Sequence, residues 1–317
     1  MQSKPNAFSP ARFLADARRT AARIDAPFCA ATTRRAVEAF AEGFHTGAVL
    51  WKTTSRPGDA LSYRFYSRIR SDTTQTAARA GLIPPDSPVT GLIRSWSALN
   101  EDATQSCDFD AHRGLAKCWV YLGGTLPLEA VLGADRVPQA LRRQEQVLRE
   151  RGLDHVRFLA VDYLGGTVNL YFRVRGPYSG AQHRGIAGLA GSPAPPERTV
   201  REIRGSLPRQ HYLAAVTLSL TTGLAERVCF YATRIPDELF PDTGARLGRF
   251  FAAAPSHDPT DVNVLAWSFG PAGTAYLKGE RSYCGDLAGL FTDDWRVLVS
   301  GTDQTDPALM SEPAARR

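Results

Sequence analysis

The sequence predicts an α+β protein built on a closed antiparallel β-barrel of about ten strands ringed by helices. The strand-like segments come in pairs joined by turn signals, which is typical of hairpins and therefore of antiparallel neighbours. Helical segments separate the hairpins, so a helix-helix-strand-strand unit recurs about five times. The polar strand faces mix cations with Tyr and Trp, which favours a walled lumen. An open sheet with one face in water remains the alternative.

Each element follows from the spacing of its apolar residues. Phe13, Ala17 and Ala21 recur at helical spacing near the start of the chain, and the period changes to two before the turn signal at 55–59. Helices are expected at 11–24, 32–44, 73–80, 90–99, 138–151, 179–190, 197–205, 237–252 and 286–291. Strands are expected at 47–54, 61–70, 104–110, 116–122, 155–163, 167–175, 213–221, 226–234, 262–269, 274–283 and 295–299.

Length and composition indicate one ordinary globular domain. The 317 residues are 43% hydrophobic and 22% charged, and no Pro, Gly or Ser linker is long enough to separate domains. We expect a single domain over 1–317, with a core from about 10 to 300 and a frayed polar tail at 301–317. No apolar run reaches the roughly 20 residues that cross a bilayer, and residues 1–10 lack a signal-peptide core. We therefore expect a soluble, cytoplasmic monomer without a membrane partner.

Charge and cysteine content exclude several classes of protein. The net charge of +6 raises nucleic acid as a partner, but no basic run or known module supports it, so none is predicted. The five cysteines have no CxxC spacing, which predicts free thiols rather than a zinc ribbon or disulfide framework. Asp108, Asp110 and His112 are read as a turn rather than a metal site. Ser256, His257 and Asp258 are consecutive and cannot form a triad.

The strand faces carry the main signal about function. In 167–175 the apolar residues point one way, and the other face holds Asn169, Tyr171, Arg173 and Arg175. The same alternation gives polar faces elsewhere that hold Arg64, Tyr66, Lys117, Trp119, Tyr121, Arg227, Tyr231, Lys278 and Glu280. Three of the chain's four lysines, Lys52, Lys117 and Lys278, fall in strands. We expect these three to mark one end of a cationic tunnel.

A tunnel of cations and aromatic rings suits an allylic diphosphate. No P-loop, dinucleotide-binding glycine motif or DDxxD box is present. Lys and Arg can stabilise a departing pyrophosphate without a metal, and Tyr and Trp faces can hold an allylic cation. A lipocalin-like carrier would need a mostly apolar lumen instead.

Eight ordered blocks between about residues 10 and 290 resemble the ABBA-type aromatic prenyltransferases, and among them the 4-hydroxyphenylpyruvate dimethylallyltransferases. The blocks are LWKTTS at 50–55, LSYRF at 61–65, DFDA at 108–111, HVRF at 155–158, RVCFY at 227–231, APSHD at 254–258, WSFG at 267–270 and ERSY at 280–283. The resemblance implies the ten-stranded PT barrel with repeated ααββ units. It also implies transfer of a dimethylallyl group from dimethylallyl diphosphate to an aromatic carbon, as in the biosynthesis of antibiotics.

Matched to the family's motifs, the diphosphate would be bound by Lys52, Arg64, Lys117, Asn169, Tyr171, Arg173, Arg227, Tyr231 and Lys278. Arg157 and Glu280 match acceptor-side positions; Glu280 is a candidate base, or it orients the acceptor or pairs with Lys278. Arg64 stands where metal-dependent members have an aspartate, so no cofactor and no magnesium requirement is expected. Another aromatic acceptor (a phenazine, naphthalenediol, flavonoid or benzoic acid), a longer prenyl donor, or a non-catalytic barrel that binds an anionic aromatic ligand are the alternatives.

Overall fold

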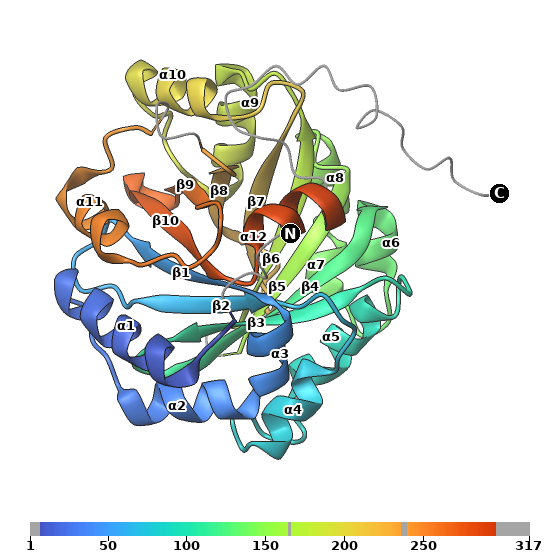
Figure 1. The fold of residues 1–317 in the computed structure, drawn as a ribbon. Helices are drawn as coiled ribbons and strands as arrows, with labels where there is room; N and C mark the ends of the chain where they lie inside the picture. Colours follow the sequence, from blue (N-terminus) through green and yellow to red (C-terminus); the bar gives the residue numbers. More distant parts are fainter. Residues whose placement is uncertain (1–6, 164–165, 236–239, 296–317) are drawn as a thin grey trace.

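The computed structural model describes residues 7–163, 166–235 and 240–295. Ten strands pair antiparallel, each with its neighbour along the chain, and β1 closes the ring against β10. The predicted closed barrel is thus confirmed (Figure 1). The strands are β1 Ala48–Thr54, β2 Ser62–Tyr66, β3 Thr104–Asp110, β4 Gly114–Pro127, β5 His155–Asp162, β6 Thr167–Arg175, β7 His211–Ser219, β8 Ala225–Ala232, β9 Asn263–Phe269 and β10 Ala275–Cys284.

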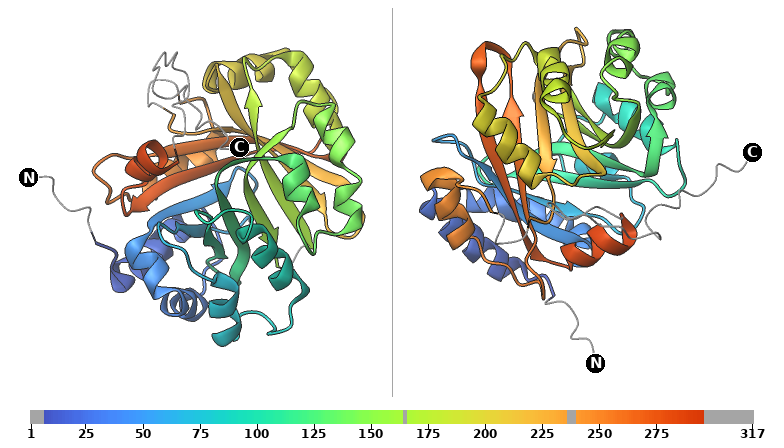
Figure 2. Two further views of the ribbon diagram at one scale, coloured as in Figure 1. Left: turned by 90° about the vertical axis from the view of Figure 1, so that its right-hand side faces the viewer. Right: turned by 90° about the horizontal axis from the view of Figure 1, so that it is seen from above.

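Helices surround the barrel in each view of Figures 1 and 2, and all of them except α12 lie on its outer side. They are α1 Pro10–Arg23, α2 Ala30–Ala39, α3 Ala41–Thr46, α4 Thr73–Arg79, α5 Pro88–Ser97, α6 Leu128–Gly133, α7 Gln139–Arg142, α8 Glu145–Arg149, α9 Gly180–Ala187, α10 Glu197–Ser206, α11 Gly244–Ala253 and α12 Leu287–Gly289. A π-helical turn, Leu290–Asp294, continues α12. None of the helices in the described ranges is long and apolar enough to span a bilayer.

Capping side chains define several helix starts. Ser179 and Gln182 form a reciprocal capping box at α9, and the Asp72 carboxylate accepts the backbone N–H of Gln75 at α4. In α1 the buried stripe of Phe13, Ala17 and Ala21 faces the barrel. The apolar periodicity therefore identified the face of α1 that packs inward.

Two hydrophobic layers follow from the alternation of the strands. Val168, Leu170 and Phe172 belong to the layer between barrel and helices, where each fully buried side chain of this size stabilises the fold by about 1.5–3 kcal/mol. Tyr171, from the opposite face of β6, belongs to the interior cluster with Trp119. The predicted division of the faces is confirmed.

Some predicted boundaries are wrong. The helix predicted at 32–44 is two helices, because Phe40 leaves the helical conformation between α2 and α3. The helix predicted at 138–151 is α7 and α8, and α6 was not predicted. In the fifth repeat the part of the chain that the structure describes holds one helix, α11, before its hairpin. The strand predicted at 295–299, apart from residue 295, and the tail at 301–317 lie outside the described residues.

Candidate active site

Two neighbouring cavities lie inside the barrel. The larger, here called the cationic cavity, has a volume of about 380 Å³. The smaller, here called the aromatic cavity, has a volume of about 80 Å³. Both are lined by Arg64, Trp119, Tyr171, Tyr231 and Glu280.

The cationic cavity brings together nine of the eleven residues predicted for the site. They are Lys52, Arg64, Lys117, Asn169, Tyr171, Arg227, Tyr231, Lys278 and Glu280. The barrel places them there because strands of different hairpins lie side by side; Lys52 on β1, for example, is in register with Glu280 on β10. The three strand lysines therefore lie in one cavity, as expected.

Asp108 of β3 organises two of the cations. It accepts a hydrogen bond from Lys52 Nζ at 2.5 Å and forms a two-point ion pair with Arg64. Arg64 and Asp108 are 2% and 1% exposed, so this pair is buried. Burial alone would raise the pKa of Asp108, but the charges of Arg64 and Lys52 outweigh burial and hold it well below its usual range. Asp108 is therefore ionised at neutral pH.

The other two lysines have different partners. Lys117 Nζ lies 3.0 Å from a carboxylate oxygen of Asp162. Lys278 Nζ lies 3.1 Å from the sulfur of Cys229. Burial, reinforced by the positive charge of Arg227, lowers the pKa of Lys278 to about 8, although Cys229 acts in the opposite direction. Lys278 can therefore gain or lose its charge within a moderate pH range.

Aromatic rings lie between the lysines and the aromatic cavity, which Arg64 also lines. The Arg64 guanidinium lies 3.9 Å from the centre of the Trp119 ring. Trp119 packs against Tyr171 with ring centres 4.5 Å apart, and Tyr171 against Tyr231 at 5.6 Å. Burial raises the pKa of Tyr171, so its phenol stays neutral. Such faces can stabilise a cation between the two cavities.

Arg157 and Arg173 lie in the aromatic cavity. Arg157 was predicted on the acceptor side, and its guanidinium lies 5.8 Å from the Phe158 ring centre. Arg173 was grouped with the diphosphate residues; the structure instead places it beside His211, with Nη2 3.5 Å from the His211 Nδ1. Because Arg173 follows Asn169 and Tyr171 along β6, it lies further along the barrel than the residues of the cationic cavity.

The alternative sites considered from sequence have structural roles. Within the described ranges, no cluster of three or more His, Cys, Asp or Glu side chains could hold a metal ion. The Asp110 carboxylate accepts the backbone N–H groups of His112 and Arg113, which is the predicted turn. His257 pairs with Asp16 rather than forming a triad. All five cysteines are free thiols.

Sequence reasoning did not select several residues of the site. Asp108, Asp162 and Cys229 are the partners of the lysines. Phe158 and Trp295 contribute rings to the aromatic cavity. Two-residue alternation within 104–110 could have placed Asp108 on an inward face. No pattern in the sequence indicates that Trp295 lines the cavity, because it follows the last strand.

Comparisons with known proteins agree with this geometry. The family model described as "Aromatic prenyltransferase Orf2" matches residues 8–295. An aromatic prenyltransferase of Sclerotinia sclerotiorum is 47% identical over 94% of this chain and 98% of that protein. A 4-hydroxyphenylpyruvate 3-dimethylallyltransferase of Streptomyces niveus is 42% identical over 95% of this chain and 93% of that protein.

Solved structures share the fold at low sequence identity. The 5-dimethylallyl tryptophan synthase of Streptomyces coelicolor, solved in complex with DMASPP and Trp, aligns with a TM-score of 0.56 at 13% identity, covering 87% of this chain and 95% of that one. A 6-dimethylallyl tryptophan synthase aligns with a TM-score of 0.54 at 12% identity, covering 87% and 96%. These likenesses support the barrel architecture.

Proposed function

This chain belongs to the aromatic prenyltransferase Orf2 family, and on that premise we propose the donor and acceptor that it uses. The donor is dimethylallyl diphosphate, and the acceptor is 4-hydroxyphenylpyruvate or a similar phenol, substituted at the carbon ortho to the hydroxyl. The single observation that carries the proposal is the adjacency of a cavity lined by six Lys and Arg side chains and a cavity lined by aromatic rings. The Streptomyces niveus relative supports this choice of substrates.

The cationic cavity would hold the diphosphate. Lys52, Arg64, Lys117, Arg227 and Lys278 all line it, and charge-assisted hydrogen bonds to phosphate oxygens are about twice as strong as neutral ones. The volume of about 380 Å³ leaves room for a diphosphate group. The ion pairs with Asp108 and Asp162 hold Lys52 and Lys117 in fixed positions before the donor arrives.

Prenyl transfer then needs three bond changes. The C–O bond between the allyl carbon and the diphosphate breaks, and pyrophosphate takes the electron pair under the charge of the cations. The allylic cation lies against the faces of Trp119, Tyr171 and Tyr231, which line both cavities. The ring carbon ortho to the hydroxyl attacks, forming the C–C bond. A base removes the ring proton and restores aromaticity.

Glu280 and the two arginines of the aromatic cavity would act on the acceptor. Glu280 lines both cavities, and its Oε1 lies 3.5 Å from Arg64 Nη2. From this position it could accept the ring proton or orient the phenol. The charges of Arg157 and Arg173 suit the carboxylate of a phenylpyruvate.

The proposal includes independence from metal ions. Arg64 supplies a fixed positive charge in the cationic cavity, where burial opposes ionisation but Asp108 holds the guanidinium charged. A diphosphate bound to this cation and to the lysines has its charge compensated without magnesium. No metal chemistry enters any of the steps above.

Product formation from a panel of acceptors tests the proposal. The full chain is incubated with dimethylallyl diphosphate and with 4-hydroxyphenylpyruvate, a naphthalenediol, a flavonoid or a benzoic acid, and products are identified by mass spectrometry. The same panel with ten- and fifteen-carbon prenyl diphosphates tests which length of prenyl chain the enzyme transfers. We expect the phenylpyruvate with the five-carbon donor to react fastest.

Variants test the assignment of the cavity. Arg64→Ala and Lys117→Ala should each lower kcat/KM for the donor by at least about tenfold, because each removes a phosphate contact. Full turnover by both variants would show that the diphosphate binds elsewhere. Binding of the acceptor without product from any donor would instead favour a non-catalytic binding barrel.

A further inference from the structure

The aromatic cavity is too small for the acceptor in the state that the structure shows. Its volume is about 80 Å³, whereas an engineered protein cavity that binds benzene measures about 150 Å³. A phenol with a side chain is larger than benzene, and the dimethylallyl group must lie next to it. Some part of the wall must therefore move before the reaction.

Most of the wall cannot move easily. Eight of the ten strands supply lining residues, and each strand is held by ladder hydrogen bonds on both sides of the closed ring. Of the described residues that line the cavity outside the strands, Pro208 and Thr233 lie in loops at strand ends, while Phe291 and Trp295 follow the last strand. The segment after β10 therefore supplies a wall that the barrel does not need for closure.

Trp295 fills the space between three strands. Its ring centre lies 4.6 Å from that of Tyr66 on β2, 5.1 Å from Tyr121 on β4 and 5.0 Å from Phe158 on β5. Phe291 stacks on its other side at 5.7 Å. Trp295 is 3% exposed, so its indole forms a buried part of the wall of the aromatic cavity.

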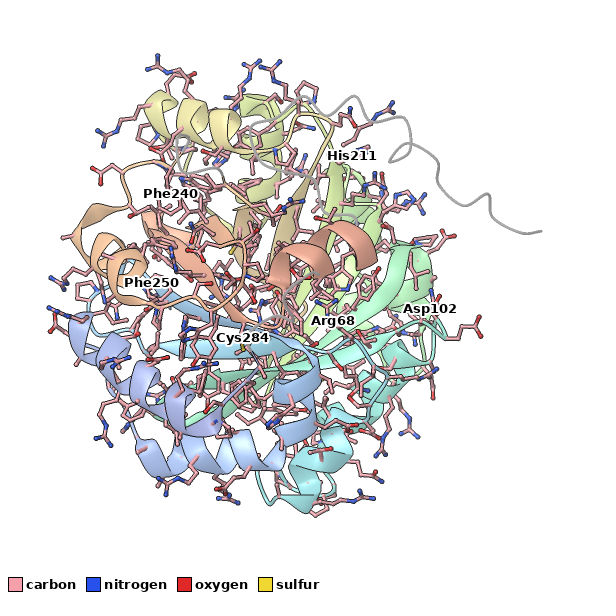
Figure 3. All side chains as sticks on the ribbon, viewed as in Figure 1. Arg68, Asp102, His211, Phe240, Phe250 and Cys284 are labelled. Atoms are coloured by element: carbon pink, nitrogen blue, oxygen red, sulfur yellow. The ribbon has the colours of Figure 1, made fainter. Side chains whose placement is uncertain are left out.

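The segment is anchored at its beginning. The Asp258 carboxylate accepts the backbone N–H groups of Asp286 and Leu287 at 2.7 and 3.1 Å. Arg68 donates to the carbonyl oxygens of Gly285 and Asp286 at 2.9 and 2.8 Å. Figure 3 labels Arg68 close to α12, which Figure 1 draws in front of the strands and inside the ring of helices.

The far end of the segment is held differently. The backbone N–H of Trp295 donates to Leu290 of its own π turn at 3.0 Å. Among the residues that the structure describes, the ring is placed by the aromatic contacts above. A shift of Trp295 would therefore break no ladder hydrogen bond, whereas a shift of any strand would break several.

We propose that Trp295 determines which aromatic acceptors this enzyme takes, by limiting the size of the ring system that fits between Tyr66, Tyr121 and Phe158. Phe291 supports the indole from behind. This inference rests on the proposed function, because it takes the aromatic cavity as the acceptor site. On this proposal, the distance that Trp295 can move limits the acceptor to small phenols.

Truncation of the indole should widen the range of acceptors. In Trp295→Ala, the volume of the indole is added to the cavity. The ratio of kcat/KM for a two-ring naphthalenediol to kcat/KM for 4-hydroxyphenylpyruvate should therefore rise at least about tenfold, which is the scale on which pocket size discriminates between substrates. Phe291→Ala should change this ratio in the same direction by a smaller factor. Trp295→Phe should keep most of the wild-type preference.

Leu287→Ala is the matched control. Leu287 is buried in the same segment but does not line the aromatic cavity, so its truncation loosens the segment without removing wall. We expect it to leave the ratio of kcat/KM values unchanged. An equal shift in Leu287→Ala would overturn the proposal, because loosening alone would then explain the effect.

The experiment separates failure of this inference from failure of the proposed function. If the wild-type chain prenylates the phenol and Trp295→Ala leaves the ratio unchanged, the role of Trp295 is refuted and the function stands. If the wild type prenylates no acceptor, the proposed function fails. Thermal unfolding is measured for each variant, and should Trp295→Ala not fold, Trp295→Phe and Phe291→Ala still report on the ratio.

Discussion

Replacement of Lys278 by arginine should remove a pH dependence from donor binding. Burial lowers the pKa of Lys278 to about 8 from the ordinary 10.5, so the side chain carries its charge below pH 8 and loses it above. A bound diphosphate favours the charged form. Well below pH 8 the donor therefore binds with its full affinity. Above pH 8 Lys278 must take up a proton each time the donor binds, which weakens binding.

The magnitude follows from this difference. The dissociation constant of the donor should rise about tenfold per pH unit once the pH is well above 8, or about 30-fold in all between pH 7 and pH 9.5. If the diphosphate restores the pKa to 10.5, the full loss is about 300-fold, equivalent to about 3.4 kcal/mol. Burial also lowers the pKa of Lys117, which would steepen the loss in the same direction.

Calorimetric titration with the donor analogue dimethylallyl thiolodiphosphate from pH 7 to 9.5 measures this dependence. A diphosphate ester is fully ionised in this range, since the pKa of a phosphate monoester is about 6. In Lys278→Arg the guanidinium stays charged throughout, so the curve should lose its rise near pH 8. A wild-type curve that is flat, or an equal rise in Lys278→Arg, would refute the reasoning.

Further variants test other parts of the site. Asp108→Asn should lower the free energy of unfolding by about 3 kcal/mol in urea denaturation, because Arg64 is left buried with Glu280, at 3.5 Å, as its one charged partner among the described residues. An unchanged midpoint would contradict this. Since ionised Asp108 contributes stability only above the pH at which it protonates, that difference between wild type and variant should persist from pH 8 to pH 5. In steady-state kinetics, Lys117→Ala should raise the KM for the donor about tenfold, and Arg173→Ala should raise the KM for the acceptor about tenfold. The reverse pattern would show that the two cavities are assigned to the wrong substrates.

The fold could be predicted from sequence because its signals are local. Strand alternation and hairpin turns involve neighbouring residues, and β3 has the predicted bounds, Thr104–Asp110. The helix breaks could not be predicted in this way. Phe40 leaves the helix where its ring packs against Phe65 and Phe109, which come from strands distant in sequence.

The candidate site was predictable in part for the same reason. Alternation shows that Asn169, Tyr171 and Arg173 share a face, but not how far along the barrel each lies, so it does not show that Arg173 lines a different cavity from Asn169. Pairing across strands depends on register, and Lys52 and Asp108 are 56 positions apart. Trp295 lies after the last strand, where periodicity carries no information about the lumen.

Turnover in the presence of EDTA tests the central claim most directly. That claim is that protein cations alone bind and release the diphosphate beside an aromatic acceptor. The full chain, dimethylallyl diphosphate and 4-hydroxyphenylpyruvate should give the ortho-prenylated product at the same rate with and without the chelator. A rate that falls to zero in EDTA and returns with added magnesium would contradict the account.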